Sequence, residues 1–126
     1  MSQNSNQLLL EDEALRDGLQ IESQLFTIDQ KIELFNLLKN AGIRRIQVGS
    51  FVHPKIVPQM ADTDELIKTL GDQGTTLISA LILNDKGLER ALACRVQHVS
   101  MSVSVSDTHS RKNARRPAAE ALASMV

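Results

Sequence analysis

The sequence is 126 residues long, which is enough for one ordinary domain with a hydrophobic core. Hydrophobic residues make up 42% of it and charged residues 23%, as in a soluble globular protein. The net charge of −1 gives no field that would attract nucleic acid or an anionic membrane, and three Phe with no Trp or Tyr give no stacking platform for single-stranded nucleic acid.

The compartment is predicted from what the sequence lacks. The single cysteine, Cys94, excludes an internal disulfide and fits a reducing compartment. Residues 1–7 are polar and lack the regions of a signal peptide, and no apolar run approaches the ~20 residues that span a bilayer. We therefore expect a cytoplasmic protein with no membrane partner.

The hydrophobic pattern alternates between strands and helices along the whole chain. In order it predicts a strand at 8–15, a loop at 16–26, a helix from 27 to 41, a strand at 45–49, a loop at 50–59, a helix from 62 to about 70, a strand at 77–83, a helix from 84 to 93, a strand at 98–105, a polar loop at 106–116 and a helix from 117. The helix boundaries carry local signals: capping boxes at Thr27/Gln30 and Asp62/Glu65, Asn84 as a cap, Gly42 and Cys94-Arg95 at helix ends, and Pro117 at a first position.

This alternation, with a period of roughly 30 residues, indicates a parallel sheet with crossover helices. The nearly all-apolar run at 77–83 is typical of a strand buried on both faces. Two closures fit: a small open doubly wound sheet, or half of an eight-stranded barrel, whose usual size is ~250 residues. The serines that alternate along 98–105 favour a barrel wall. We expect an α/β fold, a partial TIM barrel of about the first four βα units with parallel strands.

Working side chains in a parallel sheet gather at the carboxyl ends of the strands. Arg16-Asp17-Gly18 follows the first strand and joins a permanent cation, an oxygen ligand for a hard metal ion and a residue that permits a steep turn. These three residues alone also fit a surface ion pair at a turn. His53 and His109 lie in similar loops without metal-ligand spacing, so each fits a hydrogen-bonding role in its loop.

A basic cluster precedes the last predicted helix and consists of Arg111, Lys112, Arg115 and Arg116. It fits phosphate binding at a helix N-terminus, and equally a solvated loop. Cys94 stands at a helix end away from the predicted site, so we expect its side chain to have a packing role.

Three segments together carry a family resemblance: Leu-Arg-Asp-Gly-Leu-Gln at 15–20, Ser-Phe-Val-His-Pro-Lys at 50–55 and Val-Pro-Gln-Met at 57–60, with Lys112-Asn113 further on. The chain resembles 3-hydroxy-3-methylglutaryl-CoA lyase and its relatives in the metal-dependent TIM-barrel lyase and Claisen-type synthase superfamily. The resemblance makes residues 1–126 the N-terminal part of a (β/α)8 barrel domain of the pyruvate-carboxyltransferase type.

The resemblance implies cleavage of a 3-hydroxy-acyl-CoA to acetyl-CoA and a keto acid, within acyl-CoA metabolism and leucine degradation. It implies Mg²⁺ or Mn²⁺ as cofactor, with Asp17 as a metal ligand and Arg16 as the catalytic cation that stabilises the developing enolate. Gln20 would lie in the substrate pocket. Gln47, also expected to contact substrate, stands where the lyase has a glutamate. Arg111 and Lys112 would contact CoA phosphates.

The resemblance also places the other metal ligands and the catalytic cysteine on later strands. The ligand set in this sequence is then incomplete, and we expect the isolated chain to be inactive, with a homo-oligomer or a complementing C-terminal half-barrel as partner. One alternative is a truncated product, or half of a split barrel, that acts as an interaction module. Another is a small open phosphate-binding α/β domain.

Overall fold

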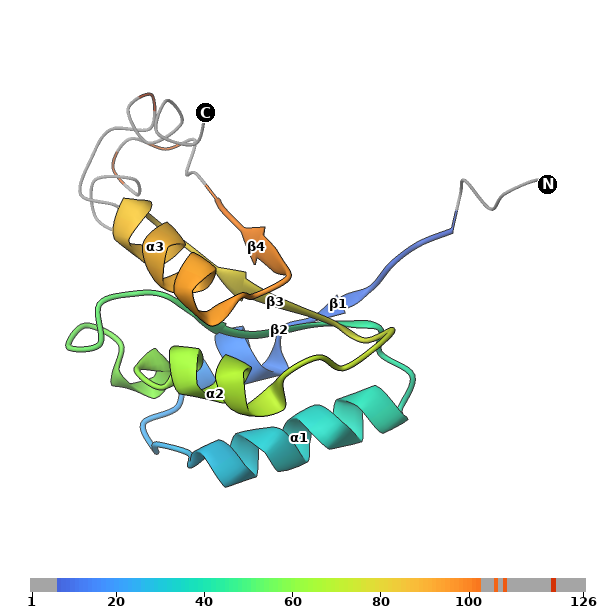
Figure 1. The fold of residues 1–126 in the computed structure, drawn as a ribbon. Coiled ribbons are helices and arrows are strands. Elements are labelled where there is room, and N and C mark those ends of the chain that lie inside the picture. Colours follow the sequence, from blue (N-terminus) through green and yellow to red (C-terminus); the bar gives the residue numbers. More distant parts are fainter. Residues whose placement is uncertain (1–6, 103–105, 107, 109–118, 120–126) are drawn as a thin grey trace.

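The computed structural model describes residues 7–102 together with residues 106, 108 and 119. Its elements are β1 (Glu11–Asp12), the π-helical turn η1 (Ala14–Gly18), α1 (Ile28–Asn40), β2 (Arg45–Ser50), the 3₁₀ turn η2 (Pro58–Met60), α2 (Thr63–Leu70), β3 (Leu77–Leu81), α3 (Asp85–Cys94) and β4 (His98–Ser100). The four strands form one parallel sheet in the order β1-β2-β3-β4 (Figure 1). The predicted α/β fold with parallel strands is confirmed.

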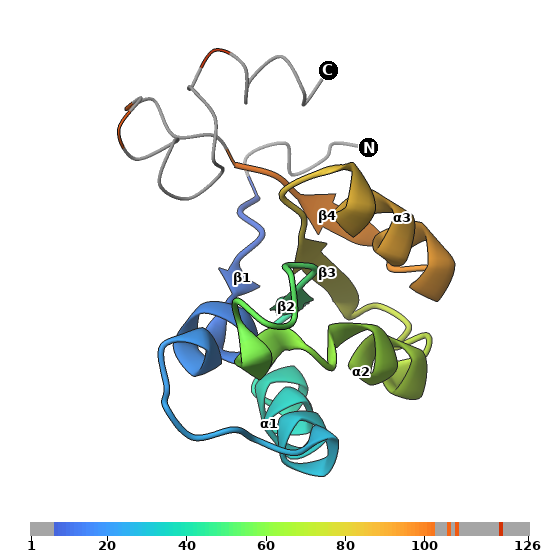
Figure 2. The same cartoon turned by 90° about the vertical axis from the view of Figure 1, so that its left-hand side faces the viewer.

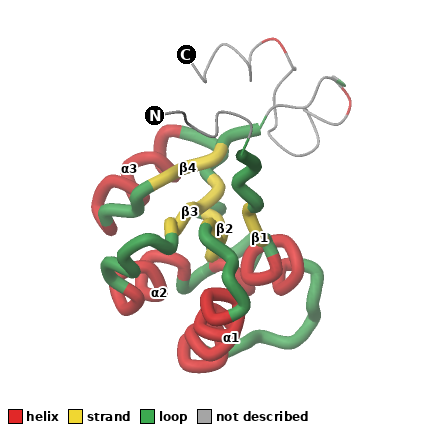
Figure 3. Tube along the Cα trace, turned by 90° about the vertical axis from the view of Figure 1, so that its right-hand side faces the viewer, coloured by secondary structure: helices red, strands yellow, loops and turns green. Residues whose placement is uncertain are grey.

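The three α-helices lie along one face of this sheet, so the fold has a strand layer and a helix layer (Figures 2 and 3). Helical segments after β1, β2 and β3 return the chain to the start of the next strand. The carboxyl ends of the strands therefore share one edge of the sheet, where the loops after β1 and β2 meet.

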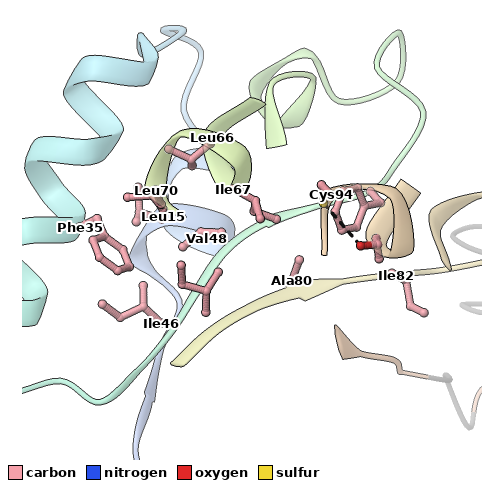
Figure 4. Packing of buried hydrophobic residues seen from close by; sticks show 13 residues of the cluster. Leu15, Phe35, Ile46, Val48, Leu66, Ile67, Leu70, Ala80, Ile82 and Cys94 are labelled. Carbon is pink, nitrogen blue, oxygen red and sulfur yellow. Dashed lines mark hydrogen bonds between the residues drawn. The ribbon is translucent and has the colours of Figure 1, made fainter. Parts of the chain in front are cut away.

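The hydrophobic core fills the space between the two layers (Figure 4). Phe35 of α1 and Leu66 of α2 are fully buried against Ile46 and Val48 of β2. The other core side chains come from the same two layers: Leu15, Phe51, Ile67, Leu70, Ile78, Ala80, Ile82, Ala91 and Cys94. The face of the sheet that turns away from the helices carries polar side chains, among them Gln47 and Ser79, which are both buried.

A register shift in β2 brings two polar side chains to that face. Gln47 pairs with Ser79, and Ser50 pairs with Leu81, with an irregularity between Gln47 and Gly49. Gln47 and Ser50 are three positions apart, so in a regular strand their side chains would point to opposite faces of the sheet. Their partners on β3, Ser79 and Leu81, are two positions apart, and the side chains of these two point to the same face. The irregularity therefore turns Gln47 and Ser50 to the same side.

Several predicted strands are longer in the sequence pattern than in the structure. The prediction of a first strand at 8–15 is wrong in extent: only Glu11–Asp12 pair with β2, and residues 14–18 form η1 instead. β3 ends at Leu81 rather than at 83. β4 is described as His98–Ser100, and the rest of the predicted strand, most of the loop at 106–116 and the helix from 117 lie largely outside the described residues.

The helices begin and end close to the predicted positions. Thr27 and Gln30 form the full capping box of α1, and Gly42 follows its end with a φ of 96°. Asn84 caps α3 by accepting from the Gly87 N–H at 2.8 Å, and Arg95 takes the left-handed conformation at its end. The capping box predicted at Asp62 is wrong, because Asp62 makes no side-chain cap and its carboxylate instead accepts from Lys31 Nζ at 2.5 Å.

Candidate active site

The Arg-Asp pair stands on a tight π-helical turn directly after β1. The carbonyl of Glu13 accepts from the backbone N–H groups of Arg16, Asp17 and Gly18 at 3.1, 2.8 and 3.2 Å. Leu15, inside this turn, is completely buried in the core. The apolar anchor fixes the turn, so its two charged side chains are held at the carboxyl end of the sheet.

Arg16 uses all three nitrogens of its guanidinium in hydrogen bonds. Nε donates to Gln47 Oε1 at 2.6 Å, one terminal nitrogen donates to Glu13 Oε2 at 3.0 Å, and the other to Asp17 Oδ1 at 3.2 Å. A planar group with three fixed partners has little freedom to rotate. The fold therefore brings Arg16 and Asp17 of η1 together with Gln47, which lies inside β2.

Gln47 is 1% exposed, and its amide is occupied on both sides. Besides accepting from Arg16, it donates from Nε2 to Glu11 Oε1 at 3.4 Å. Glu11 in turn accepts from Ser79 Oγ at 2.5 Å and from Arg45 Nε at 2.6 Å. The polar face of the sheet thus carries a continuous hydrogen-bonded network that joins β1, β2 and β3 to Arg16.

Asp17 differs from these buried groups, because its side chain is 68% exposed and makes one long ion pair with Arg16. An accessible carboxylate is a suitable oxygen ligand for a hard divalent cation. Within residues 7–102 and the three single residues that are described, no three His, Cys, Asp or Glu side chains gather into a group that could hold a metal ion. Asp17 fits one ligand position, and the others would come from outside the described residues.

Two buried polar atoms at this end of the sheet have no hydrogen-bond partner among the described residues: Gln20 Oε1 and Ser50 Oγ. Gln20 follows η1, and Ser50 is the last residue of β2. Buried polar atoms are normally satisfied, so an unpaired one at a strand end marks a place where another group can bind. Sequence reasoning predicted Gln20 but missed Ser50, whose signal is a serine that ends an otherwise buried strand.

The two loops at this edge are tied together by polar contacts. Gln59 Nε2 donates to the carbonyl of Glu22 at 2.7 Å, and Lys31 Nζ donates to the carbonyl of Gln59 at 2.8 Å. These contacts join the segment after η1 to the segment that contains η2.

The start of the second loop is held from α3. Arg90 donates to the carbonyl of Val52 at 3.0 Å and forms an ion pair with Asp64, and its guanidinium lies 5.2 Å from the centre of the Phe51 ring. Arg90 therefore fixes the point at which the chain leaves β2.

Other predicted groups are not part of this network. His53 lies in the loop after β2, where its Nδ1 accepts from the backbone N–H of Lys55 at 3.2 Å, which is the loop role expected for it. Arg111 and Lys112, like His109 and the rest of the basic cluster, lie outside the described residues. None of the helices in the described part of the chain is long and apolar enough to cross a membrane.

Comparison with known proteins gives consistent matches over most of the chain. The model of the HMGL-like family matches residues 7–126. The chain is 38% identical to a (R)-citramalyl-CoA lyase of Chloroflexus aurantiacus, over 88% of this chain and 38% of the relative. It is 36% identical to the hydroxymethylglutaryl-CoA lyase YngG of Bacillus subtilis, over 85% of this chain and 36% of the relative.

Solved structures give the same relationship. An HMG-CoA lyase from Acinetobacter baumannii, in complex with coenzyme A and 3-methylmalate, superposes with a TM-score of 0.89 and 34% identity, over 99% of this chain and 41% of that one. The HMG-CoA lyase of Brucella melitensis superposes with a TM-score of 0.86 and 35% identity, over 91% of this chain and 41% of that one. The chain thus spans well under half the length of the relatives that it matches.

Proposed function

The chain belongs to the HMGL-like family, and on that premise we propose that it supplies the N-terminal βα units of a (β/α)8 carbon–carbon lyase acting on a 3-hydroxy-acyl-CoA. The names of its relatives support this substrate class, since they are lyases of citramalyl-CoA and of hydroxymethylglutaryl-CoA. The observation that carries the proposal is the turn η1, which holds Arg16 and Asp17 side by side after β1.

Arg16 is suited to the charge that such a cleavage develops. When the carbon–carbon bond breaks, the hydroxyl gives its proton to a base and its carbon becomes the carbonyl of the keto acid. The electron pair of the broken bond passes to the thioester fragment as an enolate, which takes up a proton to give acetyl-CoA. The base and the acid would come from outside the described residues. A guanidinium held by Glu13, Gln47 and Asp17 is already oriented and needs no reorganisation to stabilise an enolate oxygen.

Asp17 would provide one oxygen to a Mg²⁺ or Mn²⁺ ion, with the remaining ligands from outside the described residues. Such an ion supplies Lewis-acid polarisation of the substrate oxygens when it is bound. The unpaired Gln20 Oε1 and Ser50 Oγ would bind polar groups of the substrate at the same end of the sheet. Arg111 and Lys112 are proposed to contact the phosphates of the CoA moiety.

The partner that completes the barrel is part of the proposal. The proposed partner is a complementing C-terminal half-barrel or a second copy of the chain, since among the described strands β1 and β4 each pair on one side only. A second candidate function is a non-catalytic interaction module, for which the unpaired outer sides of β1 and β4, among the described strands, offer edges that another chain could pair with.

The test combines the purified 126-residue chain with the C-terminal part of the Bacillus subtilis relative that follows the matched region. Acetyl-CoA release is measured from hydroxymethylglutaryl-CoA and from citramalyl-CoA with Mg²⁺ or Mn²⁺, and Mn²⁺ binding is measured by calorimetry. We expect activity and metal binding in the mixture, both lost in Asp17→Ala, and neither in the chain alone. A mixture that forms a complex without any turnover would overturn the lyase proposal and favour the interaction module.

A further inference from the structure

Glu11 is joined to the candidate catalytic arginine through one intervening side chain. Its Oε1 accepts from Gln47 Nε2 at 3.4 Å, and Gln47 Oε1 accepts from Arg16 Nε at 2.6 Å. Glu11 and Arg16 make no direct ion pair, since the carboxylate of Glu11 pairs with Arg45. The contact between the two residues runs through a single buried amide.

The charges at its two ends determine how that amide is oriented. With its oxygen toward Arg16 and its nitrogen toward Glu11, the amide offers an acceptor to a cation and a donor to a carboxylate. The reverse orientation would set two donors against each other at Arg16 and two acceptors against each other at Glu11. Because Gln47 is 1% exposed, water cannot replace either lost hydrogen bond.

Glu11 itself is held from two strands. Ser79 of β3 donates to its Oε2 at 2.5 Å, and Arg45 of β2 donates to the same oxygen at 2.6 Å. The carboxylate therefore has a fixed position relative to β2 and β3. Hydrogen bonds in such a chain polarise one another, so a charge at one end strengthens the acceptor presented at the other.

We propose that Glu11 is a positioning residue for Arg16, acting through the Gln47 amide, so that Gln47 orients the arginine rather than contacting substrate. The inference rests on the proposed function for its catalytic meaning, but the arrangement itself can be tested without catalysis. Glu11→Gln removes the charge at nearly constant shape, which frees the Gln47 amide to turn over and leaves Arg16 Nε without its acceptor.

The readout is the side-chain Nε–Hε resonance of Arg16 in the ¹⁵N-labelled 126-residue chain, identified by its disappearance in Arg16→Lys. We expect solvent exchange of this proton to accelerate about tenfold in Glu11→Gln, the effect of losing one hydrogen bond. Glu33→Gln, a change at an exposed position of α1, is the matched control and should leave the exchange rate as it is.

A double-mutant cycle distinguishes an effect of Glu11 that reaches Arg16 through the Gln47 amide from a general loss of rigidity in the structure. In a Gln47→Met background, Glu11→Gln should have no further effect on Arg16, because the connecting amide is gone. If Glu11→Gln does not fold, Ser79→Ala removes one hydrogen bond from Glu11 and should accelerate the exchange two- to threefold. An unchanged exchange rate of the Arg16 Nε proton in the folded variant, or additive effects of the two substitutions in the cycle, would overturn the proposal.

The same variants in the half-barrel complementation assay distinguish the two proposals. If the wild-type mixture has no lyase activity while Glu11→Gln still accelerates exchange of the Arg16 Nε proton, the proposed function fails and the positioning role stands. If the wild type is active, Glu11→Gln should lower kcat by about tenfold with little change in KM, since the substrate contacts themselves remain.

Discussion

At Gly49 the backbone of β2 passes so close to α2 that no side chain fits between them. A Cβ at this position would lie 2.8 Å from Thr63 Cγ2 and closer still to Thr63 Oγ1. Thr63 cannot withdraw easily, because it is buried and its hydroxyl donates to the carbonyl of Met60 at 2.8 Å. We expect Gly49→Ala to lower the free energy of unfolding by about 1–3 kcal/mol, measured by urea denaturation.

Gly18→Ala is the matched control, because its added Cβ would meet only Ala14 Cβ at an ordinary 3.9 Å. This change lies in a helical turn and should leave stability within about 1 kcal/mol of the wild type. Truncating the obstacle in the double variant Gly49→Ala/Thr63→Ala should recover part of the loss. Equal stability of Gly49→Ala and Gly18→Ala would contradict the close packing of β2 against α2.

Cys94 gives stability a pH dependence in the alkaline range. Burial in the core raises the pKa of its thiol above the ordinary value of 9.0. The unfolded thiol then ionises at a lower pH than the folded one. The stabilisation of the folded state by the neutral, buried thiol is therefore complete below pH 9 and is lost as pH rises through the folded pKa. The slope reaches at most ~1.4 kcal/mol per pH unit.

The comparison that isolates this effect is between the wild type and Cys94→Ala. Urea denaturation at a series of pH values from 7 to 10 should show a difference in stability that is constant at low pH and shrinks above pH 9. A difference that stays constant across the whole series would show that the thiol ionises equally in both states.

Among the elements, α2 and α3 begin with similar sequence signals but different contacts. Asn84 accepts from the Gly87 N–H, whereas the carboxylate of Asp62 accepts from Lys31, which is 3% exposed and belongs to α1. Asn and Asp cap helices about equally well, so a cap tolerates exchange of the two while an ion pair does not. Asp62→Asn leaves the buried ammonium of Lys31 without its counter-charge.

We therefore expect Asp62→Asn to cost about 2–3 kcal/mol of unfolding free energy, somewhat below the full effect of breaking a buried pair because Asp62 is partly exposed. Asn84→Asp at the equivalent place on α3 should change stability by less than about 0.5 kcal/mol. Thermal or urea unfolding of the two single variants provides the comparison. Equal effects would indicate that Asp62 acts as a simple cap.

These helix starts show how far the sequence can predict the structure. Capping patterns within four residues located α1 and α3 correctly, because the groups involved are neighbours along the chain. The partner of Asp62 lies 31 positions away, and only the packing of α1 against α2 brings it near. Glu11 is a similar case, since its partners Arg45 and Ser79 lie 34 and 68 positions away, on two other strands.

At the scale of the whole molecule, the apolar and polar groups are divided between the two faces of one sheet. The core lies between the sheet and the helices, and the opposite face carries Gln47, Ser79 and the Glu11 network. The motif at residues 15–20 predicts Arg16, Asp17 and Gln20 as site residues, and these roles stay predictions. It could not predict the network behind them, because that depends on strand register and on the irregularity at Gly49.

The edges of this sheet lead to a prediction about association. Of the four strands that the structure describes, β1 and β4 each pair on one side only, and Leu8, Leu9 and Leu10 beside β1 are 86, 52 and 70% exposed. Unpaired strand edges next to exposed apolar side chains favour pairing with another chain. We expect the purified chain to sediment as a concentration-dependent mixture of monomer and larger species in analytical ultracentrifugation.

Leu8→Lys/Leu10→Lys should shift this mixture toward monomer by placing charges at the β1 edge. Leu37→Lys, an equally apolar and exposed position on α1 away from the edge, should not. If both variants dissociate the assembly equally, general surface hydrophobicity drives association, and the β1 edge has no special part in it.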